Sequence, residues 1–131
     1  MLQITALYAS LLAFIYIKLS TNVIKLRRFH KVSLGYKNHK DLEQAIRAQA
    51  NFIEYVPFGL ILLSCLEINK IHPLIVFILG GLLLVGRFLH AKSFTLPGTD
   101  KIKRVQGMKF TFWSIRLMAG MLIFSFLISF I

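Results

Sequence analysis

Four long apolar runs constrain this chain more than any other feature of its sequence. They cover roughly residues 2–24, 46–68, 71–91 and 110–131. A helix that rises 1.5 Å per residue needs about 20 apolar residues to cross the hydrocarbon of a bilayer, and each run is about that long. The runs are continuously apolar and do not alternate, which argues against a membrane β-barrel. The sequence therefore predicts an all-α, integral membrane four-helix bundle, with residues 1–131 as a single transmembrane domain.

The basic residues indicate how these helices cross the membrane. A net charge of +11 would suit nucleic-acid binding if it were spread over a soluble surface, which this chain lacks. Eight of the 16 Lys and Arg lie around the first connection and seven around the third, whereas only Lys70 lies at the second. Cytoplasmic loops keep an excess of these residues. We therefore expect both long connections in the cytoplasm, both termini on the non-cytoplasmic side, and membrane lipid rather than nucleic acid as a partner.

The first run and the single cysteine each support a simple interpretation. The first run has no basic residues before it and no clear cleavage site, so we expect it to be retained rather than removed as a signal peptide. Cys65 cannot form an intramolecular disulfide, and the sequence shows no metal-ligand spacing. We interpret Cys65 as a small apolar packing residue.

The second run carries a stripe of polar residues. Arg47, Asn51 and Glu54 are spaced i, i+4 and i+7, which places them within about 60° of one another on an α-helix. Polar groups at membrane depth are costly and normally face a bundle interior, a partner or a cavity, so the stripe indicates a functional site. In the alternative, Arg47 extends to the interface, and Glu54 pairs with Arg87 or Arg116 only to be neutralised. Spacing alone leaves both interpretations open.

Other basic side chains are expected at the same depth. Arg87 and His90 end the third run, and Arg116 lies in the first turns of the fourth. Three more arginines lie near enough in sequence to complete a basic pocket: Arg27, Arg28 and Arg104. Singly, each arginine is best explained as a positive-inside anchor. Together with one amide and one carboxylate, they suit a small zwitterionic peptide that has more than one carboxylate.

Four segments carry a resemblance to a known family. Residues 47–57 read RAQANFIEYVP, residues 27–33 read RRFHKVS, residues 86–91 read GRFLHA and residues 104–108 read RVQGM. The first resembles the helix-two signature R-A-x-x-N-x-x-E-Y-x-P of the MAPEG family, the membrane-associated proteins in eicosanoid and glutathione metabolism. The other three resemble its R-R-x-x-x-V-S, its G-R-x-x-H-A and the R-x-x-G-M that opens helix four in bacterial members. Their order and spacing agree over nearly the whole chain.

The resemblance implies a homotrimer that holds glutathione between neighbouring subunits, near the cytoplasmic face of a bacterial inner membrane. Arg104 matches the arginine that stabilises the glutathione thiolate, and Lys103 is the second choice for that role. The other residues that the resemblance or the expected pocket assigns to glutathione binding are Arg27, Arg47, Asn51, Glu54, Tyr55, Arg87 and His90. Of these, Tyr55 is the weaker match, and Arg27 matches an arginine that reaches a glutathione carboxylate.

An activated thiol suggests the reaction. An adjacent cation lowers the pKa of a thiol, which is ordinarily about 8.5, and so increases the nucleophilic fraction. We therefore expect a glutathione transferase or glutathione peroxidase that acts on lipophilic electrophiles or hydroperoxides. Phe94 falls where some eicosanoid-forming members place a tyrosine hydroxyl, and His90 replaces a tyrosine relative to one subgroup. These differences argue against a dedicated leukotriene or prostaglandin synthase.

Two other functions fit the same residues. One is a non-catalytic membrane protein of this fold that binds lipid or glutathione, in which the thiol-activating cation is absent or misplaced. The other is a small transporter or channel subunit that uses the polar stripe of the second run as a pathway. Four short helices leave little room for a pore within one chain, so the second of these is the weaker alternative.

Overall fold

The computed structural model describes residues 1–94 and 100–129, and within these ranges the chain forms four helices. They are α1 (Gln3–His30), α2 (Lys40–Ile68), α3 (Pro73–Lys92) and α4 (Lys101–Ile128). Each of the four is long and apolar enough to cross a membrane. The prediction of an all-α protein with four candidate membrane spans is confirmed.

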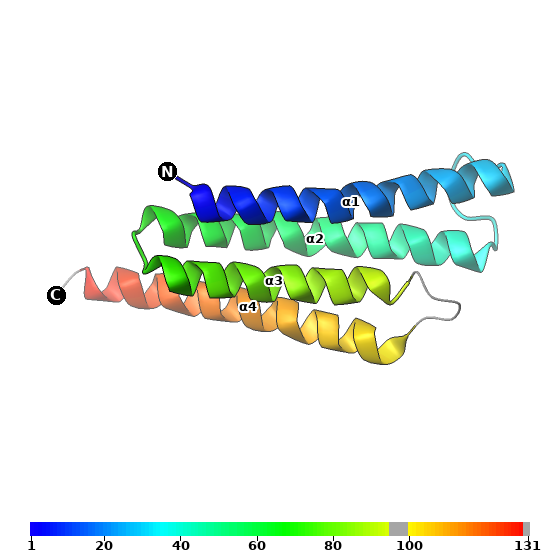
Figure 1. Ribbon diagram of the computed structural model, residues 1–131. Coiled ribbons are helices and arrows are strands. Elements are labelled where there is room, and N and C mark those ends of the chain that lie inside the picture. The colour runs from blue at the N-terminus through cyan, green and yellow to red at the C-terminus, as the bar shows by residue number, and fades with distance from the viewer. Residues whose placement is uncertain (95–99, 130–131) are drawn as a thin grey trace.

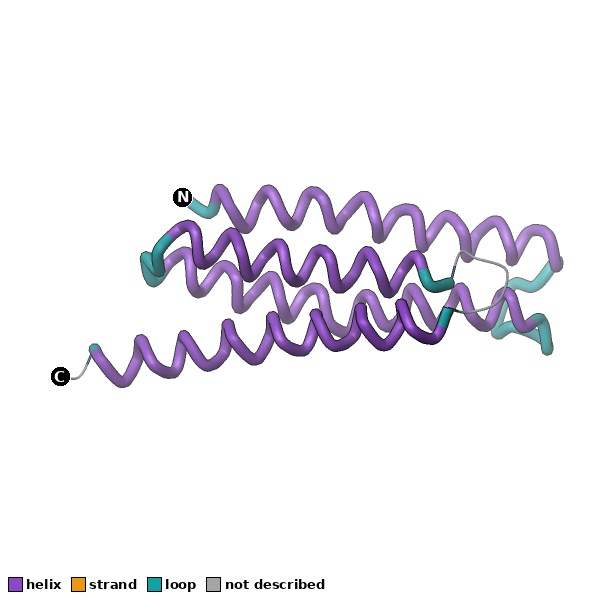
Figure 2. The backbone as a smooth tube through the Cα atoms, turned by 60° about the horizontal axis from the view of Figure 1, so that its bottom comes forward, coloured by secondary structure: helices purple, strands orange, loops and turns teal. Residues whose placement is uncertain are grey.

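The helices run up and down beside one another, with α2 and α3 in the middle (Figure 1). Among the described residues, α1 packs on α2 and α3, α4 packs on the same two helices, and α1 and α4 do not touch. Both termini lie at one end, and the α1–α2 connection lies at the other (Figure 2). The predicted topology requires this arrangement, whereas the side of the membrane on which the termini lie stays a prediction.

Three helices extend beyond the apolar runs. The helix α1 continues to His30, α2 begins at Lys40, and α4 begins at Lys101 rather than near residue 110. The start of α4 is set by Asp100, whose side chain accepts a hydrogen bond from the backbone N–H of Lys103 at 3.1 Å and so caps the helix. The apolar run from about residue 110 placed the start of the fourth helix too late, because hydropathy detects only the apolar part of a helix. Arg104 lies in its first turn.

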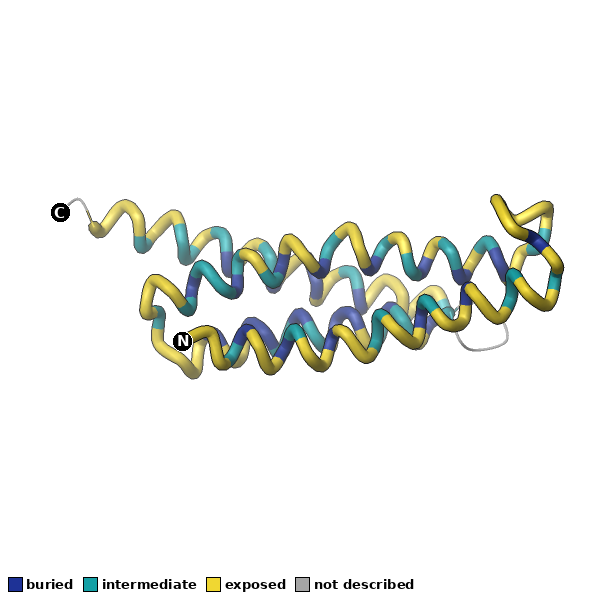
Figure 3. The backbone as a smooth tube through the Cα atoms, turned by 90° about the horizontal axis from the view of Figure 1, so that it is seen from above, coloured by how far each residue is buried: buried dark blue, intermediate teal, exposed yellow. Residues whose placement is uncertain are grey.

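Most of the bundle interior is apolar, with Arg87 and His90 among the few buried polar residues, and so is most of its outer surface. Buried positions line the inner sides of the helices, and exposed positions face outward along their whole length (Figure 3). Large apolar side chains are nevertheless more than half exposed on the outside, for example Phe14, Phe58, Trp113 and Phe124. A water-soluble protein rarely exposes so continuous an apolar surface, whereas a protein in lipid must.

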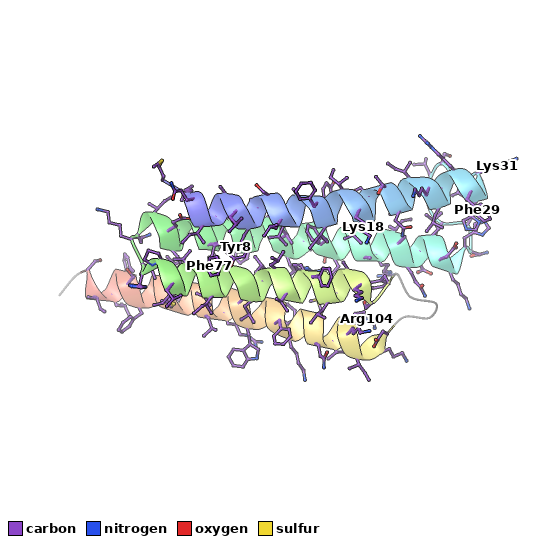
Figure 4. The ribbon with its side chains drawn as sticks, viewed as in Figure 1. Tyr8, Lys18, Phe29, Lys31, Phe77 and Arg104 are labelled. Carbon is purple, nitrogen blue, oxygen red and sulfur yellow. The ribbon has the colours of Figure 1, made fainter. Side chains whose placement is uncertain are left out.

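Polar contacts fasten the end of the bundle where the chain begins. The carboxylate of Glu67 on α2 accepts hydrogen bonds from the backbone N–H groups of Ile4 and Thr5 at 2.9 and 2.8 Å, and from the Thr5 hydroxyl at 2.8 Å. These N–H groups are donors of the first turn of α1 that have no acceptor within their own helix, so α2 supplies the cap that α1 lacks. The Tyr8 hydroxyl donates to the carbonyl of Phe77 on α3 at 2.7 Å (Figure 4).

Two glycines bring α3 and α4 into close contact. A Cβ at Gly86 would lie 2.8 Å from the backbone nitrogen of Thr111, and a Cβ at Gly107 would lie 2.7 Å from the carbonyl oxygen of Gly86. Neither helix has room for a larger residue at this crossing. Because His90 follows Gly86 by one turn and Arg104 precedes Gly107 by one turn, the crossing brings the two side chains to the same region of the bundle.

Candidate functional site

A cavity of about 720 Å³ lies among α2, the end of α3 and the start of α4, and no residue of α1 lines it. It brings together five of the predicted site residues. They are Arg47, Asn51, Glu54, His90 and Arg104. The three positions on α2 share this cavity because their spacing puts them on one face of a helix, as the sequence indicated.

The α2 stripe lines the cavity, and among the described residues its arginine and its carboxylate are not paired with each other or with the arginines of α3 and α4. The Arg47 side chain is 77% exposed, and its Nε lies 3.9 Å from a carboxylate oxygen of Glu43 one turn earlier. Glu54 is exposed and makes no hydrogen bond or ion pair within residues 1–94 and 100–129, so it does not pair there with Arg87 or Arg116. The geometry favours a site that is available to a ligand over a self-satisfied ion pair.

Arg87 does not line the cavity and lies behind the residues that do. Its side chain is fully buried, and its Nη2 donates to Asn51 Oδ1 at 2.7 Å and lies 3.1 Å from His90 Nδ1. The guanidinium also lies 5.7 Å from the ring centre of Phe52 and 5.8 Å from that of Tyr55. Arg87 therefore contacts the residues that line the cavity and is itself not accessible to a ligand.

These contacts fix which atoms face the cavity as donors. A guanidinium only donates, so His90 Nδ1 must accept, and the ring is the neutral tautomer with its proton on Nε2. The Asn51 oxygen is likewise occupied by Arg87, which leaves the amide N–H groups of Asn51 to donate. Two residues that line the cavity, Asn51 and His90, thus have N–H donors available for a ligand.

Two cations near the start of α4 differ in their surroundings. Arg104 lies near the start of α4 (Figure 4), where it is exposed, and it is one of the residues that line the cavity. Lys103 Nζ instead lies 3.1 Å from Asp100 Oδ2, and Lys103 is not among the residues that line the cavity. Hydrogen bonds from the backbone and side chain of Lys103 hold the pKa of the Asp100 carboxyl below its ordinary value. Arg104 is therefore better placed than Lys103 to stabilise an anion in the cavity.

Comparison with known proteins gives this fold and site a family. The model of the MAPEG family matches residues 5–124. The chain belongs to the MAPEG family. It is also 36% identical, over 92 residues that make up 70% of each chain, to the inner membrane protein YecN of Escherichia coli strain K12, and equally similar to YecN of strain O6:H1. The protein is a multi-pass membrane protein, as predicted, and some MAPEG proteins are glutathione-dependent enzymes.

Two MAPEG positions that we assigned to glutathione binding lie outside the cavity of this chain. Arg27 Nη1 donates to the carbonyl oxygens of Ser33 and Gly35 at 3.2 and 2.9 Å, which fixes the α1–α2 connection. Tyr55 is half-buried and packs edge-on against Phe112, with ring centres 5.4 Å apart. Neither residue lines the cavity.

The remaining basic candidates, Arg28 and Arg116, also lie outside the cavity. Arg28 is exposed near the end of α1. The Arg116 guanidinium lies 5.9 Å from the ring centre of Trp113, and both of these side chains are exposed on α4. Both positions fit the positive-inside interpretation that the sequence allowed for each arginine.

Several residues that line the cavity were not among the predicted site residues. They include Tyr36, Gln44 and Met108. Gln44 precedes Arg47 by three positions, and Met108 follows Arg104 by four. Continuing each helical face by one turn would have found both. Tyr36 belongs to the α1–α2 connection, where no periodicity applies. Phe94 does line the cavity, so this wall has no hydroxyl at that position.

Proposed function

We propose that this protein is a glutathione-dependent transferase or peroxidase that acts on lipophilic electrophiles or hydroperoxides, with glutathione bound in the cavity beside α2. One observation carries the proposal. A single cavity gathers two guanidinium groups, one amide, one imidazole and one carboxylate, from Arg47, Arg104, Asn51, His90 and Glu54. A purely structural arrangement would pair these groups with one another.

The cavity suits glutathione in charge and in size. Glutathione has two carboxylates and one ammonium, and an exposed guanidinium such as that of Arg47 binds a carboxylate through two parallel hydrogen bonds. The exposed carboxylate of Glu54 suits the ammonium, and the Asn51 amide offers N–H donors to the peptide carbonyls. The volume of about 720 Å³ lies within the range of about 300–1,000 Å³ that is usual for small-molecule sites.

Arg104 is the residue that we propose for activation of the thiol. Its guanidinium stays charged at neutral pH, so it lowers the pKa of an adjacent thiol and stabilises the thiolate. The Nε2–H of His90 offers the sulfur a neutral donor on the same side. The thiolate can then displace a leaving group from carbon to give a thioether. With a hydroperoxide it attacks the terminal oxygen, the O–O bond breaks, and the alkoxide leaves as an alcohol after protonation. The glutathione sulfenic acid formed in this step then condenses with a second glutathione to give the disulfide and water.

The resemblance that implies this activity also implies a homotrimer, which we include in the proposal. Arg27 lies outside the cavity of its own chain, so it can reach glutathione only at the site of a neighbouring subunit. The α1–α2 connection holds the Arg27 guanidinium in a defined position. Native mass spectrometry of the detergent-solubilised protein should give three times the mass of one chain. A stable monomer with full glutathione affinity would contradict this assembly.

The first experiment tests Arg104. Purified protein in detergent is assayed with glutathione and a chromogenic aryl halide, and with a lipid hydroperoxide. We expect Arg104→Ala to reduce kcat/KM by about 100-fold or more, which is typical for the loss of a group that stabilises charge in the transition state. Arg104→Lys should retain part of the rate. Arg116→Ala is the matched control, because it removes the same charge from the same helix outside the cavity.

The outcomes separate the enzyme from a binding protein. Equal rates in the wild type and in Arg104→Ala would remove Arg104 from the mechanism. Glutathione binding without turnover on any of these substrates would favour the non-catalytic alternative. Phe94 is the observation that keeps this alternative in view, because it lines the cavity without the hydroxyl that some eicosanoid-forming members place at this position.

A further inference from the structure

A second cavity, of about 450 Å³, opens between α1 and α3. No residue lines both this cavity and the proposed glutathione site. Its most prominent lining residues are three lysines, which come from two helices: Lys18, Lys25 and Lys92. We name it the lysine groove.

The lysines of the groove lie on helices, and helix geometry brings their side chains together. Lys18 and Lys25 are spaced i, i+7 on α1 with Asn22 between them, so all three lie on one face of the helix. Lys92 is the last residue of α3. Among the described residues that line the groove none is acidic. Three like charges around one opening favour the binding of an anion there.

The groove lies at the depth of lipid headgroups. The 28 residues of α1 span about 42 Å, whereas the hydrocarbon is about 30 Å thick. A crossing of about 20 residues that starts at Gln3 ends near Asn22. Lys18 is then about one turn inside the hydrocarbon and Lys25 about one turn outside it, while α3 ends its own crossing at Lys92. The ammonium of a lysine one turn inside the lipid extends toward the headgroups along its flexible stem.

The deeper part of the groove is apolar. It is lined by Ile15, Leu19, Phe88 and Ala91, and Thr21 is the one other described residue of the lining. Phe88 is 53% exposed on the outside of α3, and Lys92 Nζ lies 5.9 Å from the centre of its ring. A charged opening therefore leads to an apolar surface that continues toward the centre of the membrane. Only an amphipathic ligand matches both parts.

We propose that the lysine groove binds an anionic phospholipid of the same leaflet, with its phosphate among the three lysines and an acyl chain along Phe88 and Ile15. Asn22 supplies a neutral hydrogen-bonding group beside the phosphate. General positive-inside charge needs no convergence of two helices and no apolar floor. The groove has both, which distinguishes a lipid site from topology alone.

The test measures phospholipid binding to the full-length protein. Wild-type protein in a neutral detergent is titrated with a fluorescent short-chain phosphatidylglycerol and, separately, with the matching phosphatidylcholine. The triple variant Lys18→Gln, Lys25→Gln, Lys92→Gln should weaken phosphatidylglycerol binding by about tenfold or more, because each lysine near an anionic lipid contributes several-fold to affinity. Phosphatidylcholine should bind the wild type more weakly and respond little to the substitutions.

A matched control separates the groove from overall charge. The triple variant Lys37→Gln, Lys40→Gln, Lys101→Gln removes the same charge from exposed positions outside the groove. It should keep phosphatidylglycerol affinity within about twofold of the wild type, because charge outside the site is screened within about 10 Å. An equal loss in both triple variants would overturn the proposal in favour of diffuse surface charge.

Two further measurements keep the proposal falsifiable. Millimolar inorganic phosphate should not displace the lipid, and full competition would show a free-anion site instead of a lipid site. Single Lys18→Gln and Lys18→Arg variants guard against misfolding of the triple variant, with Lys18→Gln expected to lose affinity and Lys18→Arg to keep it. Glutathione binding should be unchanged in all groove variants, since the two cavities share no residue.

Discussion

Arg87 shows how a single buried charge can organise a site that it does not enter. Its guanidinium holds the oxygen of Asn51 and the Nδ1 of His90, and thereby sets the donors that both residues have available for a ligand. The cost of burying the charge is offset by these hydrogen bonds and by the aromatic rings of Phe52 and Tyr55 nearby. We assign Arg87 a positioning role in the proposed site.

Replacement of Arg87 tests that role. Arg87→Met removes the donor to the buried Nδ1 of His90, which costs about 1–3 kcal/mol, and the donor to the half-buried oxygen of Asn51. We expect glutathione affinity, measured by calorimetry, to fall by about tenfold or more. Arg87→Lys should retain the fold and recover only part of the affinity, because one ammonium lacks the planar fork that reaches both acceptors.

Nitrogen NMR of His90 separates positioning from a general loss of structure. The wild type should show the tautomer that is protonated on Nε2, and Arg87→Met should show a mixture of the two neutral tautomers. A wild-type protein with its proton on Nδ1 would contradict the geometry.

Asp100 gives the start of α4 a dependence on pH. Its carboxylate caps the helix and its pKa is lowered, so the stabilisation is fully present above the unfolded-state pKa of about 3.9 and is lost as pH falls through the lower folded-state pKa. Hydrogen exchange of the first turn of α4 should therefore stay protected from pH 7 to about pH 4 and lose protection below that. Asp100→Ala should lose it at every pH. An Asp100→Ala protein with wild-type protection would exclude the cap.

Among the elements, the α3–α4 pair has little tolerance for added volume, because the nearest atoms at its crossing include backbone atoms. Gly86→Ala would place a methyl group 2.8 Å from backbone and side-chain atoms of Thr111, so the helices must separate. We expect a loss of about 1–3 kcal/mol in the free energy of unfolding in detergent. We also expect lower glutathione affinity, because Arg104 would move away from His90.

Gly120 is the matched control for that substitution. It lies on α4, and a Cβ added there would meet no atom of the described residues within 4 Å, so Gly120→Ala should be neutral or slightly stabilising. Equal destabilisation by Gly86→Ala and Gly120→Ala would show that the crossing does not explain the effect.

How much could be predicted differs from element to element. The four spans follow from hydropathy, because each must present apolar side chains to lipid over its full length. The shared face of Arg47, Asn51 and Glu54 follows from helical spacing. The start of α4 at Lys101 could not be predicted in this way, because its first turns are polar and depend on the Asp100 cap. The burial of Arg87 could not be predicted either, because it depends on how α2, α3 and α4 pack around it.

For the whole molecule, the orientation in the membrane can be measured directly. In a Cys65→Ala background, Lys37→Cys in the α1–α2 connection should react with a membrane-impermeant maleimide only in inverted vesicles. Ser129→Cys, just after α4, should react only from the opposite side. Labelling of Lys37→Cys in intact cells would reverse the proposed topology and place the glutathione cavity on the outer side.

The contact between Glu67 and the start of α1 bears on how the chain enters the membrane. The donors at the beginning of the first helix find their acceptor only at the end of the second, so neither helix is complete when alone in lipid. In the proposed topology, the carboxylate and the N–H groups that it satisfies cross the membrane together. Insertion of the first two helices as one hairpin is thus favoured over insertion of the first helix by itself.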